Sequence, residues 1–224
     1  MRAMFSFLQP IFTALLECIY PPVCGVCGKV GEKWICNKCL HNIQAKAENR
    51  RRGYLTASYE DGFFLLSYHR DEIKKMLLSY KFYQSAYLYR TFVKIILKNE
   101  KACRFLKKYD IMIPVPIHND RKRKRGYNQS ELIAKEIGKK LDIPVISNCL
   151  VKIKNVVPQS TLNKEQRKQN IKGVYQVKKE ETIKGKRIVL VDDIFTTGST
   201  LEECSKMLKQ AGASKIGIFT IAKD

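Results

Sequence analysis

Acidic residues are scarce in this 224-residue sequence, which has 21 Asp and Glu against 42 Lys and Arg, a formal net charge of +21. A deficit of negative charge this large favours polyanionic partners such as nucleic acid, phosphorylated ligands or an acidic membrane surface. A lysine-rich, solvated surface would give the same balance. The hydrophobic content of 45% and the charged content of 28% are those of a globular chain, so disorder is not expected.

A long uninterrupted apolar segment is also missing. The first 20 residues are mostly apolar, but Gln9, Pro10 and Glu17 interrupt them, whereas a bilayer span needs about 20 apolar residues. We therefore expect neither a membrane span nor a signal peptide. The apolar spacing in this segment instead predicts a helix that packs on the body of the protein.

A dense disulfide framework is absent as well. Of the eight cysteines, four are concentrated in residues 24–39 and the others are scattered along the chain. Secreted disulfide scaffolds are smaller and denser in cysteine, so we expect a reducing, cytoplasmic compartment.

The clustered cysteines form two Cys-x-x-Cys pairs, Cys24 with Cys27 and Cys36 with Cys39. Each pair delivers two thiolates from one tight turn, and four thiolates complete the tetrahedron that Zn²⁺ prefers, with no position left open for a substrate. The pattern therefore predicts a structural zinc ribbon. Two disulfides or a redox dithiol are the alternatives.

The rest of the chain predicts an α/β domain. We expect residues 1–50 to form the apolar helix and the zinc ribbon, and residues 51–224 to form the main domain. Helical patterns begin near residue 67 and recur at 92–96, 130–141 and 201–211, apolar strand patterns lie at 111–115, 145–146, 188–191 and 216–221, and residues 152–173 suit a long polar loop. Alternating units of this size predict a parallel sheet with helices on both faces.

The most informative stretch is 187–200, where a buried strand runs into Asp192 and Asp193, followed by a loop and a new helix. Ligands of parallel sheets bind beyond the carboxyl ends of the strands. Two carboxylates placed there can accept hydrogen bonds from sugar hydroxyls, and the amides of a helix start favour a phosphate. The loop residues that would surround this phosphate are Thr196, Thr197, Gly198, Ser199 and Thr200. An ordinary strand-to-helix turn is the alternative.

Residues 187–200 resemble the phosphoribosyl pyrophosphate signature of type I phosphoribosyltransferases. The resemblance implies that Asp192 and Asp193 hold the ribose hydroxyls and serve catalysis, and that residues 196–200 hold the 5′-phosphate. It also implies a pyrophosphate loop that contains Val115 and Pro116. Mg²⁺ would bind largely through the oxygens of phosphoribosyl pyrophosphate, so no separate protein motif for it is expected.

Several further motifs occur in an order that is similar to the ComF family, which is named for DNA uptake in bacterial competence. These are the four cysteines, Tyr68, Lys81-Phe82, residues 113–116 and 125–129, Pro158, Gln159, Arg167, Asn170 and residues 173–175. The resemblance implies a type I phosphoribosyltransferase-like fold and a mobile loop at 154–172, in which Gln159 and Arg167 would lie over the site. The family often has arginine where this chain has Lys152, and lysine lacks the bidentate fork of a guanidinium.

A basic run precedes one of these motifs. Its members are Arg121, Lys122, Arg123, Lys124 and Arg125. Five consecutive cations suit a pyrophosphate or a nucleic-acid backbone, with a solvated loop as the alternative. We select Arg125 as a catalytic candidate, because it opens the motif, and the other four as nucleic-acid candidates. Residues 80–90 also interleave aromatics with cations, as in proteins that stack single-stranded DNA.

No motif names an acceptor for a phosphoribosyl group, and no glutaminase domain is present. Three functions fit: a phosphoribosyltransferase in nucleotide salvage, a non-catalytic regulator that senses phosphoribosyl pyrophosphate, and a competence factor that processes incoming single-stranded DNA. We favour the competence factor, with phosphoribosyl pyrophosphate as ligand, single-stranded DNA as partner, and a competence helicase or other DNA-processing proteins as protein partners.

Overall fold

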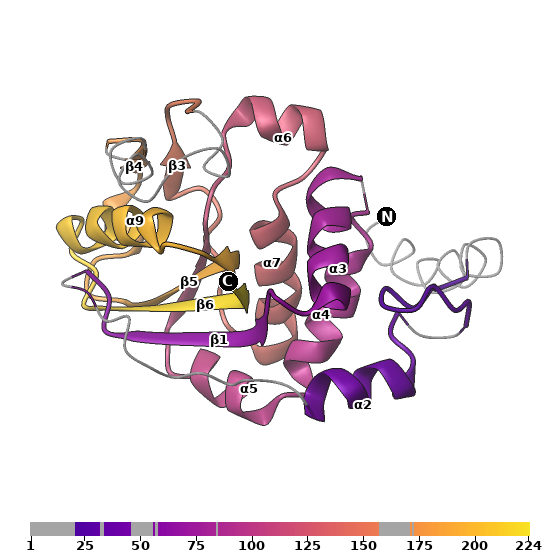
Figure 1. The fold of residues 1–224 in the computed structure, drawn as a ribbon. Coiled ribbons are helices and arrows are strands. Elements are labelled where there is room, and N and C mark those ends of the chain that lie inside the picture. Colours follow the sequence, from indigo (N-terminus) through magenta and orange to yellow (C-terminus); the bar gives the residue numbers. More distant parts are fainter. Residues whose placement is uncertain are drawn as a thin grey trace, which may run out of the picture.

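The computed structural model describes residues 21–31, 34–45, 56, 58–83, 85–156, 171 and 173–224. Its centre is a four-stranded sheet in the order β1-β6-β5-β2, and all neighbouring strands are parallel (Figure 1). The strands are β1 (Asp61–Ser67), β2 (Ile111–Pro114), β5 (Arg187–Phe195) and β6 (Lys215–Lys223). A separate antiparallel pair consists of β3 (Leu150–Lys152) and β4 (Tyr175–Val177).

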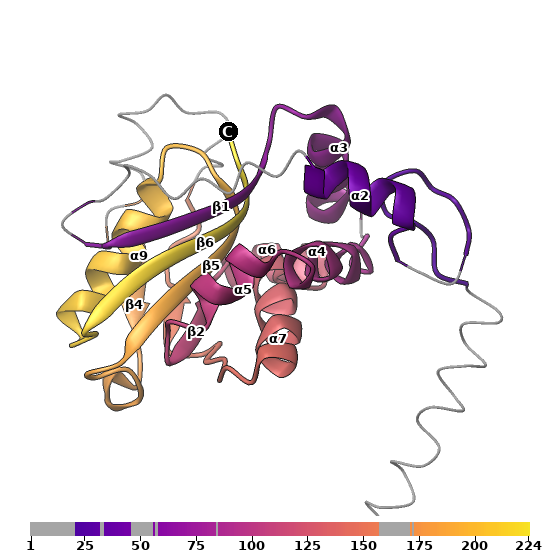
Figure 2. The same ribbon diagram turned by 90° about the horizontal axis from the view of Figure 1, so that it is seen from below.

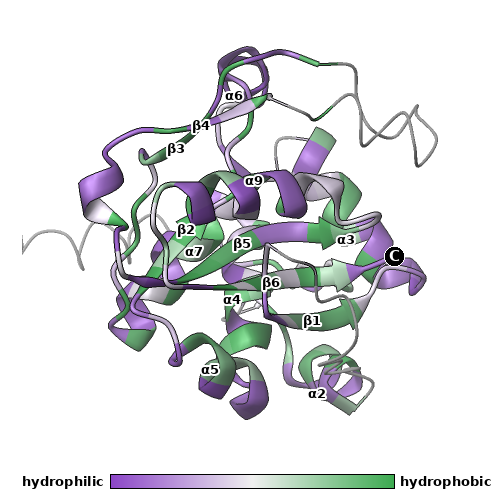
Figure 3. Ribbon diagram, turned by 90° about the vertical axis from the view of Figure 1, so that its left-hand side faces the viewer, coloured by the Kyte–Doolittle hydropathy of each residue, from purple (hydrophilic) through white to green (hydrophobic). Residues whose placement is uncertain are grey.

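Helices cover both faces of the sheet, which confirms the predicted α/β architecture (Figure 2). One face carries α3 (Asp71–Phe82), α4 (Leu88–Leu97), α5 (Glu100–Leu106) and α7 (Gln129–Leu141), and the other carries α9 (Ser199–Gln210) with the β3–β4 pair. The other helices of the described residues are α2 (Asn37–Ala45), α6 (Asn119–Arg125) and the short η2 (Glu180–Thr182). In Figure 3, α5 and α9 alternate between hydrophobic and hydrophilic stretches, as helices with one buried face do.

Strand β5 illustrates why the central strands are apolar throughout. Successive side chains of a strand point to opposite faces. Val189 and Val191 accordingly pack with α7 and its neighbours, whereas Ile188 and Leu190 pack with α9. A strand buried on both faces has no polar alternation, which explains the continuous apolar run in the sequence.

The cysteine segment is seated directly on the main domain. Cys24 and Ile35 belong to the same apolar cluster as the residues of α4, and the Thr91 hydroxyl donates to the carbonyl of Trp34 at 2.6 Å. A Cβ atom at Gly25 would lie only 2.5 Å from Leu88, so a larger residue would push the two parts apart. The predicted domain boundary at residue 50 and the predicted helix in residues 1–20 lie outside the described residues.

Several local predictions were wrong. Strand β1 was not predicted at all. The polar loop expected at 152–173 is not among these errors, because it runs between the end of β3 and the start of β4, and most of it lies outside the described residues. Instead of a strand at 145–146, Val145 forms a single bridge with Met112. The solvated loop considered for the basic run is the helix α6, which begins after His118, whose side chain accepts from the N–H of Asp120, and ends at Gly126 in the left-handed conformation.

Candidate functional site at the end of strand β5

Asp192 and Asp193 lie in the last part of β5, past the point where β2 ends. The final β2–β5 partners are Pro114 and Val191, while β5 continues beside β6 as far as Phe195. The carboxylates are therefore inside the strand rather than just after it, but still at the carboxyl edge of the sheet. That edge is where ligands of parallel α/β domains bind.

The two carboxylates have different partners. The hydroxyl of Ser130, in the first turn of α7, donates to Asp192 Oδ1 at 3.0 Å. The Asp193 side chain forms an ion pair with Lys81 at the end of α3, where Nζ lies 3.1 Å from Oδ1. Asp193 is only 7% exposed, so this pair is held largely away from water. Two elements distant in the sequence thus converge on the adjacent aspartates.

Burial and the neighbouring Asp193 carboxylate raise the pKa of Asp192 to about 7. The Lys81 ammonium, the Asp193 N–H and the Ser130 hydroxyl act in the opposite direction. Near neutral pH the Asp192 carboxyl is therefore present in both its protonated and its ionised form. Such a group becomes a stronger acceptor for hydroxyl donors, and a better ligand for a hard cation, as the pH rises.

The loop after β5 turns sharply into α9. Gly198 has a φ of +77°, a conformation that other residues rarely adopt, and a Cβ atom there would lie 2.8 Å from the ring of Phe195. Both the backbone conformation and the lack of space therefore favour glycine. The hydroxyls of Thr197 and Ser199 are hydrogen-bonded at 2.9 Å. Because α9 begins at Ser199, the free amides of its first turn lie directly after the carboxylates, where an anion is favoured.

Helix α6 divides the basic run into two faces. Arg121 and Arg125 are partly buried, whereas the three residues between them are exposed. Their spacing of four residues places the two arginines on one side of the helix. On the exposed side, Lys122 contacts Glu131 at 3.1 Å and Arg123 pairs with Asp120.

The inward arginines belong to a cluster of cations around the aspartates. Burial lowers the pKa of Arg125, and the Asp193 carboxylate opposes this shift. Burial and the charge of Arg121 lower the pKa of Lys152, which Asp192 opposes. With Lys81, these groups carry more positive charge than two carboxylates can neutralise, so the surroundings favour a polyanionic ligand.

Residues 125–129 have a clear structural role. The Asn128 side chain donates to the carbonyl of Val115 at 3.0 Å, which joins the start of α7 to the end of β2. The hydroxyl of Tyr80 donates to the carbonyl of Gln129 at 2.9 Å, and the rings of Tyr80 and Tyr127 stack with centroids 5.5 Å apart. The motif therefore fixes α3, α6 and α7 relative to the carboxylates.

Val115 and Pro116 stay predicted ligand contacts, but their backbone offers little to a phosphate. The N–H of Val115 donates to the carbonyl of Val191 at 2.9 Å, and proline has no N–H. Backbone donation to a pyrophosphate from this segment would have to come from residues 117–119. Gln159 and Arg167 lie outside the described residues.

The four clustered cysteines lie close enough to share a metal ion. Their sulfur atoms are all within 4.8 Å of one another, and tetrahedral Zn²⁺ with bonds of about 2.3 Å places sulfurs about 3.8 Å apart. Burial raises the pKa of Cys24, but the N–H groups of Cys27, Cys36 and Val26 outweigh it and lower the pKa to about 6. All cysteines in the described residues are free thiols. The donor set fits a soft, thiolate-binding metal.

Two site residues were not selected from the sequence. Lys81 was noted only as part of the ordered motifs, and Ser130 only as the start of a predicted helix.

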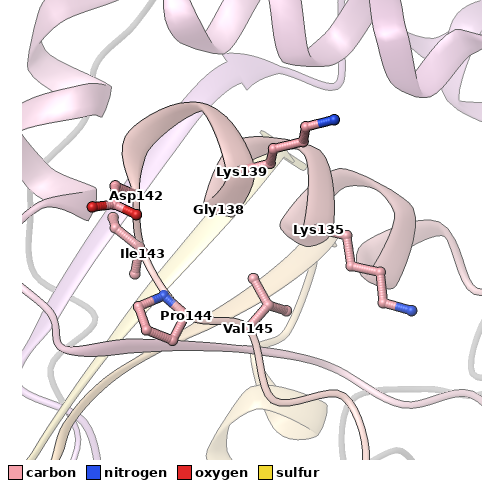
Figure 4. A pocket seen from close by; sticks show the side chains of 7 residues that line it. All are labelled: Lys135, Gly138, Lys139, Asp142, Ile143, Pro144 and Val145. Atoms are coloured by element: carbon pink, nitrogen blue, oxygen red, sulfur yellow. The ribbon is translucent and has the colours of Figure 1, made fainter. Parts of the chain in front are cut away.

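A hollow elsewhere on the protein, shown in Figure 4, is lined by Lys135, Gly138, Lys139, Asp142, Ile143, Pro144 and Val145. It lies at the far end of α7, a helix about 20 Å long, and contains none of the predicted site residues.

Comparisons with known proteins agree with this arrangement. A family model described as phosphoribosyl transferase domain matches residues 127–224, which include both aspartates and the loop into α9. The chain is also 29% identical over 209 residues to competence protein F of Haemophilus influenzae, covering 90% of this chain and 85% of that protein. These matches support a ComF-type protein with a phosphoribosyltransferase-like domain.

Other ComF-type similarity is more local. Over 114 residues the chain is 30% identical to DNA utilization protein YhgH of Shigella flexneri. The aligned residues make up 51% of this chain and 49%, about half, of that protein. Among solved structures, a hypoxanthine phosphoribosyltransferase from Staphylococcus aureus aligns with 18% identity and a TM-score of 0.40 over 60% of this chain and 64% of that one. The matched domain model begins after the cysteine cluster and after Arg125. None of the described helices is long and apolar enough to cross a membrane.

Proposed function

We propose that this ComF-type chain binds phosphoribosyl pyrophosphate with Mg²⁺ in the cytoplasm and acts as a phosphoribosyltransferase-like factor in natural competence. One observation carries the proposal. Adjacent carboxylates at the end of β5 precede the hydroxyl-rich start of α9, and a cluster of partly buried cations faces them. A ligand with a sugar diol, a terminal phosphate and a pyrophosphate matches these three features in turn.

Each part of the ligand has an assigned place. Asp192 and Asp193 accept hydrogen bonds from the ribose hydroxyls, and the first turn of α9, from Ser199, receives the 5′-phosphate. Arg121 and Arg125 face the pyrophosphate. A Mg²⁺ ion bound with the ligand would supply neutralising charge, and the hard carboxylate oxygens of Asp192 and Asp193 fit such an ion.

If the chain catalyses transfer, its residues act mainly through position and charge. Breaking the bond between ribose C1 and pyrophosphate leaves positive charge on the sugar and negative charge on the leaving group. Arg125 stabilises the leaving group, and the Asp193 carboxylate lies on the side of the sugar. Without an acceptor that suits the site, the same residues would bind and sense the ligand only.

Thermal unfolding with and without phosphoribosyl pyrophosphate and Mg²⁺ tests ligand binding, and pyrophosphate release across a panel of nucleobases tests transfer. We expect a saturable rise in melting temperature for the wild type and little or none for Asp193→Asn. Glu180→Gln is the matched control, because Glu180 is an exposed carboxylate before the start of β5, at the opposite edge of the sheet. No stabilisation of the wild type at millimolar ligand would refute the proposal. Pyrophosphate release that depends on one nucleobase would distinguish an enzyme from a sensor.

The surface beside the site supports single-stranded DNA as a further partner. Phe82, Tyr83 and Tyr87 are 67%, 75% and 42% exposed. The guanidinium of Arg125 lies 5.8 Å from the ring centre of Phe82, and Trp34 lies 6.1 Å from Tyr87. Exposed rings beside cations are the combination on which unstacked bases bind.

The outward cations of α6 would add contacts to the DNA backbone. Tyr83→Ala should weaken binding to a single-stranded oligonucleotide by roughly 1–3 kcal/mol, the usual contribution of one stacked base. Ile153→Ala, which removes an exposed apolar side chain elsewhere, should not. Lys124→Gln should reduce the salt dependence of binding by about one ion. Equal affinities for the wild type and Tyr83→Ala would exclude this surface.

The cysteine cluster completes the proposal as a structural zinc site. Its four thiolates leave no position for a substrate. The cysteine segment shares an apolar cluster with α4. Zinc would therefore stabilise the packing of this segment on α4, and with it the surface on which the rings of Trp34 and Tyr87 meet.

A further inference from the structure

The position of Lys81 is unusually well defined for a lysine. It lies in the last turn of α3, next to Tyr80, which is fully buried. The Tyr80 hydroxyl donates to the carbonyl of Gln129, and the Tyr80 carbonyl accepts from the hydroxyl of Tyr127. The backbone that carries Lys81 is therefore tied to the start of α7, and little freedom remains in where its side chain begins.

The lysine ammonium meets Asp193 in a largely dry environment. The side chains of Lys81 and Asp193 are 23% and 10% exposed, and Nζ lies 3.1 Å from Oδ1. An ion pair on an open surface contributes little, but attraction between charges increases as water is excluded. An ammonium has three donors, so Lys81 can hold one carboxylate oxygen and still present donors to a ligand.

The charged groups around Asp193 come from three elements. Asp192 precedes it on β5, Arg125 faces it from α6, and Tyr80 lies beside it on α3. Lys81 is the cation in direct contact with it among the ion pairs of the described residues. Two adjacent carboxylates repel each other, and the Lys81 ammonium opposes this repulsion, so without it the pKa of Asp192 would rise further above its ordinary value.

We propose that Lys81 is a positioning residue, which holds the Asp193 carboxylate in place to accept hydrogen bonds from the ribose hydroxyls. The inference rests on the proposed function, because it specifies how that site is prepared for its sugar. A protonated carboxyl donates a hydrogen bond instead of accepting two and is a poor partner for a Mg²⁺-bound ligand. Lys81 thus keeps the acceptors of the site ready before the ligand arrives.

Calorimetric titration of phosphoribosyl pyrophosphate and Mg²⁺ between pH 6 and pH 9 tests this role. We expect Lys81→Met to weaken binding by about fivefold at pH 7, which corresponds to a further rise of about one unit in the pKa of Asp192. The loss should shrink towards pH 9, where both carboxylates ionise without help. Lys81→Arg, which keeps the charge, should retain most of the affinity.

Two controls separate positioning from other effects. Lys140→Met removes an exposed lysine at the end of α7 and should leave binding unchanged at every pH. Urea unfolding of each variant verifies the fold. A merely structural role for Lys81 would give the same loss at every pH.

The outcomes distinguish this inference from the function on which it rests. If the wild type fails to bind phosphoribosyl pyrophosphate at any pH, the proposed function falls and the role of Lys81 falls with it. If the wild type binds, but Lys81→Met binds equally well or is weakened equally at all pH values, only the role of Lys81 is refuted. A loss confined to lower pH and restored by arginine supports it.

Discussion

Replacing Asp192 by asparagine should make the ligand-free protein more stable while abolishing its binding of phosphoribosyl pyrophosphate. Asp192 is partly buried beside a second carboxylate, and its pKa is raised from 3.8 to about 7. Asparagine is nearly the same shape and keeps an oxygen that can accept from Ser130 and from the backbone. It removes the charge that the folded protein disfavours.

The sign of the pH dependence follows from the raised pKa. The folded state binds the Asp192 proton more tightly than the unfolded state, so this group supports folding fully below pH 4. The contribution is lost progressively as the pH rises through about 7. A shift of about three units corresponds to an upper limit of roughly 4 kcal/mol across that whole range. The part that falls between pH 5.5 and pH 8 is about 2 kcal/mol, because half of the Asp192 carboxyl is still protonated at pH 7.

The assay is urea unfolding of wild type and Asp192→Asn at half-unit intervals from pH 5.5 to pH 8.5. The free energy of unfolding of the variant, minus that of the wild type, should increase by about 2 kcal/mol up to pH 8 and then level off. Glu180→Gln, at an exposed carboxylate, should give a flat difference. A flat difference for Asp192→Asn as well would show that Asp192 has an ordinary pKa, and the account of its environment would be wrong.

Three further changes test other parts of the molecule. Gly198→Ala should lower the free energy of unfolding by at least 1–2 kcal/mol, the approximate cost of the left-handed conformation, because its Cβ atom would also approach Phe195; an unchanged urea midpoint would contradict this. Asn128→Ala should cost about 1–3 kcal/mol in the same measurement, because it removes a helix cap and leaves the Val115 carbonyl without this donor. Cys36→Ser should lower the zinc content from about one ion per chain to a small fraction, measured by a colorimetric chelator; wild-type protein purified without zinc would refute a zinc site.

The acidic strand and the loop into α9 were predictable because their determinants are local. Within residues 187–200, a strand apolar on both faces, two carboxylates, a glycine and a run of hydroxyls follow one another directly. The same holds for the paired cysteines, whose sulfurs do lie together. The conformation of such segments can be predicted from neighbouring residues, without knowledge of contacts with distant parts of the chain. The exact end of β5 was less accessible, because its extension to Phe195 depends on pairing with Lys223 of β6.

Strand β1 and the pairing of Lys81 with Asp193 depend on contacts between distant parts of the chain. Phe63 to Leu66 are buried on both faces only because β1 pairs with β6 at the other end of the sequence. The strand therefore has no alternating pattern, and its short apolar run resembles the beginning of a helix as much as a strand.

The sequence by itself determined the fold class, through the order of its helical and strand patterns, and also the adjacent carboxylates, the hydroxyl-rich loop after them and the cysteine cluster, which depend on neighbouring residues. Only the tertiary structure decided which cations serve the carboxylates. Five consecutive basic residues look equivalent in the sequence, but the phase of α6 directs Arg121 and Arg125 inward and leaves Lys124 exposed. Lys81 reaches Asp193 because α3 is tied to α7 above the end of β5. Contacts between charged side chains that are distant in the sequence depend on how the helices pack, and a local sequence pattern does not show this packing.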